Sequence, residues 1–489
     1  MNRWSPVLLS MLSMLVIGTF HGLQGQNFEW AASASGLPSG YRFATTDSTN
    51  NIIVGGSITV PRIILRAPNS SNDINVAVYD GHGDNVDVEL YKYSDILMNF
   101  ASNGSVNWWV STSAEHNELV GIAHQGGLTA LLIMVDDCLY GYEVEELAPM
   151  GCLPDFFGED SVKHGLNIIF LDSNGNFAKH QTIFEDYHAY IDVSDFKAHP
   201  SGGYVLAGEA DEGLIAHSYP QAGYGGASVL LKLTEEGKPE WMKVVSGIKP
   251  ASGSPKIAIS DKGEIYIGGM QRKSEKYPFP KGYDFAMTKL LTDDEHTEYF
   301  DSYIASYSSA GNFNWVTKIG ERAILKDFAF NNNRILAGWM SKTKQPFEKN
   351  HPEEDEEEEE QYYFTRLSGN GKVLKEQIIN PARDIYDICP HPDRGFYITQ
   401  LSREIVAPRS IHTVEVHHYN RRKSELMSQL PPAFGTGEYA PQLQINSKND
   451  VFFVGGVFSG VRTMLSTVDS ALNKAESRGN AMVVGKLNQ

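Results

Sequence analysis

Residues 312–315 read Asn-Phe-Asn-Trp, residues 27–30 read Asn-Phe-Glu-Trp, and the chain ends Val484-Gly485-Lys486-Leu487-Asn488-Gln489. Elsewhere, a Lys-Leu strand end of this kind comes just before a turn and a Trp strand, as in Leu231-Lys232-Leu233 ahead of Trp241. The last strand therefore lacks a partner that the first strand can supply. A repeat divided between the two ends of a chain predicts a ring that is closed by pairing those ends.

The tryptophans recur at a constant distance from a turn. Trp follows a turn glycine by four residues at Gly104–Trp108, Gly237–Trp241 and Gly311–Trp315. Because side chains alternate along a strand, this offset puts each Trp on the same face of its strand. Large aromatic residues dominate buried cores, so the repeated Trp predicts structural packing and not ligand stacking.

Each copy of the repeat closes with a second hairpin. A polar-Gly turn precedes a β-branched and aromatic run that ends in glycine, as in residues 261–269 and 448–456. Turn residues that flank such runs are typical of β-hairpins. Six complete copies are present, and a seventh can be assembled from the two ends of the chain. Four strands per copy in a radial array predict an all-β, seven-bladed β-propeller, which forms one domain over residues 26–489 and is closed by pairing the C-terminal strand with the N-terminal segment.

The repeat is best preserved in residues 301–338 and 228–269. There it resembles the bacterial β-propeller repeats of the SBBP type, which occur in exported proteins. This resemblance implies the fold and supplies no catalytic residues. The Gly-x-x-x-Trp turn is also similar to that of quinoprotein-type propellers, which would imply a quinone-dependent dehydrogenase. That interpretation needs a channel-bound cofactor and a metal site that the sequence does not display.

One set of connections in the repeat is long. On the strand pattern we interpret these connections as the segments between blades, and all of them would open onto one face of the disc. They cover residues 57–94, 136–165, 209–226, 270–300, 339–361, 402–412 and 457–479. Connections of this length are unusual unless they are functional or disordered, and binding residues usually sit on loops that a rigid scaffold holds. The sequence therefore predicts a binding site on this long-loop face.

Two of these insertions carry clusters of aromatic residues. Segment 209–226 holds Tyr219 and Tyr224, and segment 270–300 holds Tyr277, Phe279 and Tyr283. Aromatic loops of mixed polarity suit contact with a glycan or a protein. They equally suit a lid that packs on the propeller. These five residues are the candidate ligand-binding residues.

Several segments superficially resemble metal sites. Residues 353–360 are consecutive carboxylates, and because such a block repels itself we expect a disordered, solvated loop over 352–360 and not a calcium cage. His417 and His418 are neighbours in an expected strand and face opposite ways. Asp172-Ser173-Asn174-Gly175-Asn176 occupies a hairpin turn and lacks the distal Glu of a calcium loop. The sequence thus predicts no metal and no cofactor.

The N-terminus predicts an export signal over residues 1–25. Arg3 precedes the apolar run Val7–Phe20, which is too short to span a bilayer comfortably, and cleavage is expected near Gly25. No later stretch approaches 18 uninterrupted apolar residues, so we expect no stable membrane insertion. In an oxidising compartment Cys138 and Cys152 can pair within one insertion, and the alternative is three unpaired thiols with Cys389.

The formal net charge is −19 and the pI is near 5.2, which argues against nucleic acid as a partner because it requires a basic face. The chain has no Gly-x-Ser-x-Gly elbow, no HExxH helix and no phosphate loop. We therefore predict an exported, monomeric, non-catalytic propeller that binds an extracellular protein or glycan through its long-loop face. The alternative is a propeller enzyme that acts on an extracellular polysaccharide, with an acid/base pair assembled from separate blades.

Overall fold

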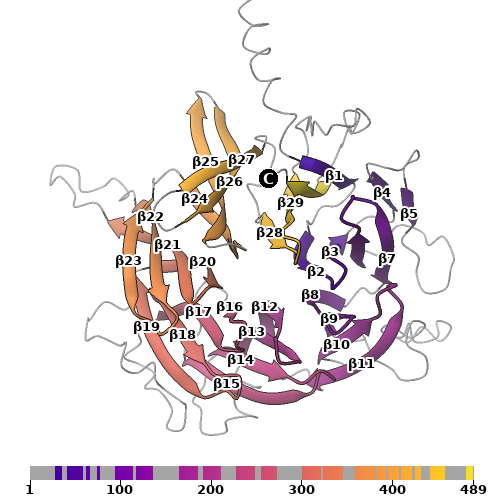
Figure 1. Ribbon diagram of the computed structural model, residues 1–489, viewed down its shortest axis with the longest axis horizontal. Helices are drawn as coiled ribbons and strands as arrows, with labels where there is room; N and C mark the ends of the chain where they lie inside the picture. Colours follow the sequence, from indigo (N-terminus) through magenta and orange to yellow (C-terminus); the bar gives the residue numbers. More distant parts are fainter. Residues whose placement is uncertain are drawn as a thin grey trace, which may run out of the picture.

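The described residues of this computed structural model form strands and turns (Figure 1). Among the described residues there is no helix of the length and apolarity that a membrane-crossing helix needs. The structure describes residues 28–35, 41–58, 62–66, 74–77, 94–113, 117–135, 165–184, 191–210, 227–247, 255–272, 300–320, 323–344, 358–379, 383–391, 395–406, 409–420, 424–430, 441–457 and 481–487.

Seven antiparallel sheets surround a central hole, so the described chain is a seven-bladed β-propeller, as predicted (Figure 1). We number the blades in chain order, and in each the first strand lies nearest the hole. Blade 1 contains β2 (Tyr41–Thr46), β3 (Ile52–Ile58), β6 (Ser94–Phe100) and β7 (Val106–Ser113). Blade 2 contains β8 (Asn117–Gln125), β9 (Leu128–Val135), β10 (Gly165–Leu171) and β11 (Phe177–Phe184). Blade 3 contains β12 (Ile191–Ala198), β13 (Tyr204–Ala210), β14 (Ala227–Leu233) and β15 (Pro239–Gly247).

The remaining blades follow the same order. Blade 4 contains β16 (Lys256–Ile259), β17 (Ile265–Arg272), β18 (Phe300–Tyr307) and β19 (Phe313–Gly320). Blade 5 contains β20 (Ala323–Asn331), β21 (Arg334–Lys344), β22 (Glu358–Ser368) and β23 (Val373–Ile378). Blade 6 contains β24 (Arg383–Pro390), β25 (Phe396–Val406), β26 (Arg409–Tyr419) and β27 (Ser424–Leu430). Blade 7 contains β28 (Gln442–Ile445), β29 (Val451–Val457), β30 (Ala481–Leu487) and, from the other end of the chain, β1 (Phe28–Ser35).

The two ends of the chain close the ring in blade 7. Strand β1 pairs antiparallel with β30, from Phe28 opposite Leu487 to Ser35 opposite Ala481. This pairing confirms the predicted closure and gives β30 a partner on both sides, which removes a free strand edge. Two short strands, β4 (Arg62–Arg66) and β5 (Ile74–Ala77), extend this sheet beyond β1, an addition that the sequence did not predict.

The long connections join strands within one blade, which corrects their interpretation as segments between blades. The hairpin that follows each Trp strand in sequence belongs to the next sheet, because its second strand pairs with the strand beyond the insertion, as Leu132 does with Ile168. Since strands alternate in direction, the connections from second to third strand still leave from one face, which we call the connection face. The tight hairpins between first and second strands and between third and fourth strands lie on the opposite turn face.

Two of the predicted long segments are shorter than expected. Strand β25 ends at Val406 and β26 begins at its Cα partner Arg409, so strand fills most of segment 402–412. Strands β21 and β22 likewise extend into segment 339–361. Residues 358–360 of the acidic block lie in β22, opposite residues 342–344 of β21, because the backbone ladder continues through them. The prediction of a disordered loop does not hold for those three residues, and the rest of 352–357 lies outside the described residues.

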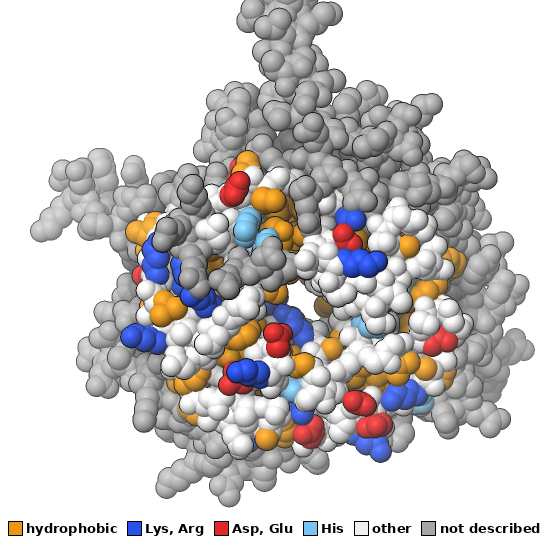
Figure 2. Space-filling model, viewed as in Figure 1, with side chains coloured by type: hydrophobic (Ala, Val, Ile, Leu, Met, Phe, Trp, Pro, Cys, Tyr) orange, Lys and Arg blue, Asp and Glu red, His pale blue; other side chains and the backbone are white. Residues whose placement is uncertain are grey.

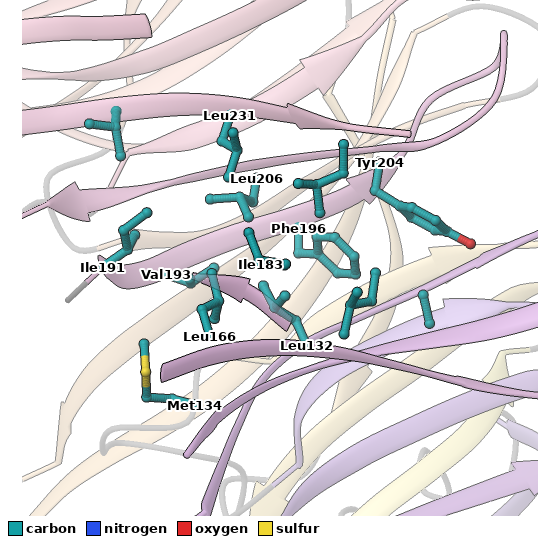
Figure 3. Packing of buried hydrophobic residues seen from close by; sticks show 14 of the residues in the cluster. Leu132, Met134, Leu166, Ile183, Ile191, Val193, Phe196, Tyr204, Leu206 and Leu231 are labelled. Atoms are coloured by element: carbon teal, nitrogen blue, oxygen red, sulfur yellow. The ribbon is translucent and has the colours of Figure 1, made fainter. Parts of the chain in front are cut away.

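Apolar side chains between the sheets form the core. Between blades 2 and 3, Leu132 and Leu166 pack with Phe196 and Leu206, all of them buried (Figure 3). Each such side chain stabilises the fold by roughly 1.5–3 kcal/mol relative to an exposed one. The sheets approach so closely that a Cβ on Gly121 would lie 2.7 Å from the Cβ of Phe196. The face-to-face packing of blades therefore requires a glycine at this point of β8.

The repeated tryptophans join each blade to the next one. In three blades the indole Nε1–H donates to a backbone carbonyl in the outer turn of the following blade, over 3.0–3.1 Å: Trp108 to Ser173, Trp241 to Ser309 and Trp315 to Gly369. Blade 2 has a lysine at this position, and the Lys179 ammonium donates to the corresponding carbonyl, that of Glu235, over 3.2 Å. The structural role predicted for Trp is therefore confirmed, and it lies between blades.

This contact also explains the glycine in three of the outer turns. Gly371 adopts φ +82°, and a Cβ there would lie 2.5 Å from the Trp315 ring. Gly175 and Gly311 have the same conformation and the same close approach to Trp108 and Trp241. Only glycine combines a left-handed turn with an open face for the neighbouring indole.

A second set of bonds joins the inner turns on the turn face. The residue that opens the first hairpin of a blade donates to a backbone carbonyl of the next blade. These bonds run from the Gln125 amide to His199, from His199 Nε2 to Gly263, from the Asn331 amide to Gly395 and from the Asn446 amide to Asn50. The turn face is thus linked around much of its circumference.

Candidate functional site

The predicted aromatic site and the predicted disulfide lie outside the described residues. This applies to Tyr219, Tyr224, Tyr277, Phe279, Tyr283, Cys138 and Cys152. Those assignments stay predictions. Cys389 in β24 is a free thiol, and burial raises its pKa well above the usual range, so it is held as the neutral thiol.

The described strands do show where the two aromatic insertions begin and end. Ala210 at the end of β13 pairs with Ala227 at the start of β14, and Arg272 pairs with Phe300 in the same way in blade 4. Paired strands lie about 4.8 Å apart, so each insertion leaves and returns at nearly the same point. Blades 3 and 4 are neighbours, since the Ile257 N–H of β16 bonds to Asp195 of β12. Both aromatic insertions therefore arise from adjacent blades on the connection face.

A carboxyl group with a raised pKa lies where β13 leads into the insertion before β14. Glu209 precedes Ala210 and is the Cα partner of Asp192 on β12. Burial, and then the negative charge of Asp192, raises the pKa of Glu209 to about 7. A carboxylic acid with a pKa near neutrality can donate or accept a proton at physiological pH. Glu209 is thus a candidate general acid on the connection face.

Glu209 was missed in the sequence, although the repeat contains a signal for it. The same register position is occupied by Met134 in blade 2, Met270 in blade 4 and Met340 in blade 5, and all three are buried. A glutamate replaces a buried methionine at this position. Glu209 is half-buried, and charged side chains are rare where the repeat buries apolar ones, so alignment of the second strands would have singled it out.

Three aspartates lie on inner strands, and each binds its own blade to the next one. Each lies at a β-bulge, and its Oδ2 accepts a backbone N–H of the following inner strand over 2.6–2.7 Å. The pairs are Asp195 with Ile257, Asp327 with Ile388 and Asp387 with Leu443. An inner strand is a sheet edge, so these bonds satisfy N–H groups that would otherwise lack a partner in the ladder. Their primary role is structural.

The charges around the central hole influence one another. Burial, and then the charge of Asp327, raises the pKa of Asp387 to about 8, and burial also raises the pKa of Asp327. Burial alone would lower the pKa of Lys197, but Asp195 (3.3 Å from its ammonium) and Asp327 outweigh it and raise that pKa. Figure 2 shows basic and acidic side chains close to the open hole. Among the described residues no group of three His, Cys, Asp or Glu could hold a metal ion.

Two sequence features that resembled metal sites have structural partners. His417 contacts Glu415, whereas the His418 ring stacks on His391 at 4.0 Å between centroids, so the adjacent histidines do face opposite ways. Asp172 closes the β10–β11 turn, where its Oδ1 accepts the backbone N–H groups of residues 174 and 176. As predicted from the sequence, this segment is a hairpin turn.

Comparison with known proteins finds similarity to solved structures only. No protein-family model matches the chain, and no curated protein matches it. Among solved structures, the chain is similar to a mutant of the NanB sialidase from Streptococcus pneumoniae, with 7% identity, coverage of 95% of this chain and 94% of that chain, and a TM-score of 0.39. It is similar to a mutant of the Synechocystis apocarotenoid oxygenase, with 12% identity, 96% coverage of each chain and a TM-score of 0.38.

A gluconolactonase from Xanthomonas campestris has 11% identity, covers 81% of this chain and 90% of that chain, and has a TM-score of 0.33. At these identities and TM-scores, the likenesses carry no argument about activity.

Proposed function

We propose that the protein is an exported binding protein that engages an extracellular protein or glycan through its connection face. One observation carries this proposal: the two aromatic insertions arise from paired stems in adjacent blades on the same face. Residues 1–25 support export, since they have the composition of a signal peptide.

The scaffold beneath these insertions suits recognition. The stems belong to sheets whose second strands are buried, as Leu206 and Ile267 are, so the ends of the insertions are held in place. Tyrosine and phenylalanine supply a large contact area at low entropic cost, and they are common at the centres of protein interfaces and in contact with sugars. Ordered stems also reduce the entropy that a loop loses on binding.

The test uses two variants of the full chain. One replaces Tyr219 and Tyr224 with serine, and the other replaces Tyr277, Phe279 and Tyr283 with serine. Binding is measured on a glycan array and against a panel of immobilised extracellular proteins. We expect each variant to lose at least tenfold in affinity for the ligand that the parent retains.

The matched control is Leu374→Ser, which removes a 48% exposed apolar side chain from β23, away from the aromatic insertions. It should bind as the parent does. Unchanged binding by both aromatic variants would exclude these insertions as the recognition surface.

A second candidate function, hydrolysis of an extracellular polysaccharide, is favoured by Glu209. Glycoside hydrolysis uses a carboxylic acid with a raised pKa together with a second carboxylate. Glu209 has such a pKa, and Asp192 is the neighbouring carboxyl group. The test follows release of reducing ends from a polysaccharide panel by the parent, Glu209→Gln and the control Glu235→Gln, which alters a turn carboxylate. Turnover that is lost only in Glu209→Gln supports hydrolysis, and turnover that Glu209→Gln retains excludes Glu209 as the acid.

A further inference from the structure

Ser424 and Ser201 each contact a histidine, and the two contacts differ in the partner of the second ring nitrogen. Ser424 Oγ lies 3.2 Å from His417 Nδ1, and Ser201 Oγ lies 2.9 Å from His199 Nδ1. The second ring nitrogen of His417 lies 2.8 Å from Oε2 of Glu415. The second nitrogen of His199 instead donates to the backbone carbonyl of Gly263 over 3.0 Å.

The strand geometry places the first three side chains in a row. Glu415 and His417 are alternate residues of β26 and share one face, and Ser424 begins β27 opposite Tyr419. The side chains of Glu415 and His417 are only 7% and 6% exposed, whereas Ser424 is exposed. A buried carboxylate–imidazole pair thus ends in a hydroxyl that solvent can reach.

The hydrogen-bond partners set the tautomer of His417. The carboxylate of Glu415 can only accept, so Nε2 of His417 carries the proton and Nδ1 is left to accept from the Ser424 hydroxyl. A serine hydroxyl is a weak nucleophile until a neighbouring base takes its proton, and a buried carboxylate stabilises the imidazolium that forms. The three groups are thus linked in the order nucleophile, base and carboxylate, with Nδ1 of the imidazole toward the serine and Nε2 toward the carboxylate.

We propose that Ser424, His417 and Glu415 form an acyl-transfer site that hydrolyses esters of apolar acyl groups. Ser424 is the nucleophile, His417 is the base and Glu415 is the positioning residue. The acyl preference follows from β27 itself. Leu426 is the Cα partner of His417 and is 49% exposed, so it offers an apolar surface to an acyl chain next to the imidazole.

The reaction balances with water as the second substrate. Ser424 Oγ bonds to the ester carbonyl carbon while its proton passes to Nδ1 of His417. The bond to the alkoxide then breaks, and the alcohol leaves with that proton, which gives an acyl-serine. Water attacks the acyl carbon and returns a proton to Nδ1, and Ser424 recovers it as the carboxylic acid departs.

This site is separate from the proposed binding surface. Ser424 is the first residue of β27, the outer strand of blade 6, and lies at the turn-face end of that strand. Loss of binding through the aromatic insertions and loss of ester hydrolysis can therefore be measured independently. No motif marks the site in the sequence, because Ser424 is not in a Gly-x-Ser-x-Gly elbow.

The first test labels the full chain with a fluorophosphonate probe, maps the modified serine by mass spectrometry and measures hydrolysis of p-nitrophenyl butyrate. We expect the adduct on Ser424. Ser424→Ala should lose the adduct and at least 100-fold in kcat/KM, while Ser201→Ala keeps both because that pair has no carboxylate. No adduct on Ser424, equal labelling of Ser201 or full hydrolysis by Ser424→Ala would overturn the proposal.

The second test separates positioning from stability. Glu415→Gln keeps the size of the side chain and removes the charge that stabilises the imidazolium. We expect kcat to fall about 100-fold with a nearly unchanged KM, and the acid limb of the pH–rate profile to move to lower pH. A variant that melts earlier yet keeps the parent's pH–rate profile would show a structural role only and would contradict the assignment of Glu415.

Discussion

The two faces of the disc are built in different ways. On the turn face, side chains bond across blades at equivalent positions, as Trp315 does to Gly369 and His199 does to Gly263. On the connection face, the second and third strands of the blades are joined by segments of very different length, from residues 407–408 in blade 6 to residues 59–93 in blade 1. The repeat therefore constrains the turn face, where a change affects two blades, and leaves the connection face free to vary.

Both faces depend on a closed ring, so removing β1 should have the largest effect on the stability of the fold. A chain that lacks residues 1–35 leaves β30 paired only with β29 and with its other edge unpaired. We expect loss of the cooperative thermal transition and aggregation in size-exclusion chromatography, because a free edge strand pairs with other chains. A chain that begins at residue 26 is the control and should melt as one transition; equal behaviour of the two chains would contradict closure through β1.

The indole contact on the turn face can be isolated by comparing two glycines. A Cβ on Gly371 (φ +82°) would lie 2.5 Å from the Trp315 ring, whereas a Cβ on Gly127 (φ +79°) would have no atom within 4 Å. Both alanine variants incur roughly 1–2 kcal/mol of left-handed strain, and Gly371→Ala adds roughly 1–3 kcal/mol of overpacking. Urea denaturation should rank Gly371→Ala clearly below Gly127→Ala. Equal losses would mean that the indole does not constrain the turn.

The same contact can be weakened from its donor side. Trp315→Ala removes both the packing and the bond to Gly369, and should cost about 2–3 kcal/mol in the free energy of unfolding. Lys179→Ala removes a bond of the same kind and the contact of the ammonium with the Phe170 ring, 4.5 Å from its centroid, but no large buried side chain, and should cost less than Trp315→Ala, about 1 kcal/mol. Chemical denaturation of both variants tests this ranking. A larger loss in the free energy of unfolding for Lys179→Ala than for Trp315→Ala would contradict it.

Much of this architecture follows from local pattern. Seven blades, the closure of the ring and the packing of Trp108, Trp241 and Trp315 are all visible in the sequence, because turn glycines and alternating strands are short-range signals. The assignment of hairpins to blades was wrong because the hairpin at residues 261–269 has the same pattern whichever sheet it joins. Only the pairing across the insertion decides that.

The chemistry of the inner strands needs contacts between blades. Asp195, Asp327 and Asp387 lie in three different inner strands, so no spacing marks them until the blades are superposed. Ser424 likewise meets His417 through the pairing of β26 with β27. The aromatic insertions could be identified by composition, but which ligand they would take depends on how their side chains are arranged.

The aspartate bonds of the inner strands predict a smaller, pH-dependent effect. The pKa of folded Asp387 is about 8, above its usual 3.8, so folding favours the neutral form. The stability that it contributes is fully present below about pH 4 and is lost as the pH rises through about 8. Asp387→Asn keeps an acceptor for the Leu443 N–H and should flatten this decline in thermal melts between pH 4 and 8.

The control for this effect is Asp172→Asn on the turn face. Hydrogen bonds from Asn176 lower the pKa of Asp172, so its contribution is lost only as the pH falls below the usual carboxyl range. Between pH 4 and 8 this variant should run parallel to the parent. A parallel profile for Asp387→Asn as well would contradict the raised pKa of Asp387.

The division of labour between the two faces is tested most directly by shortening both aromatic insertions. Blade 6 shows that a second and third strand can be joined through two residues, between Val406 and Arg409. We would replace residues 211–226 and 273–299 by two-residue hairpin turns and measure both the melting temperature and binding to the ligand that the parent retains. The account predicts an unchanged melting temperature and abolished binding. Retained binding, or a melting temperature lowered by a lid that had packed on the blades, would contradict it.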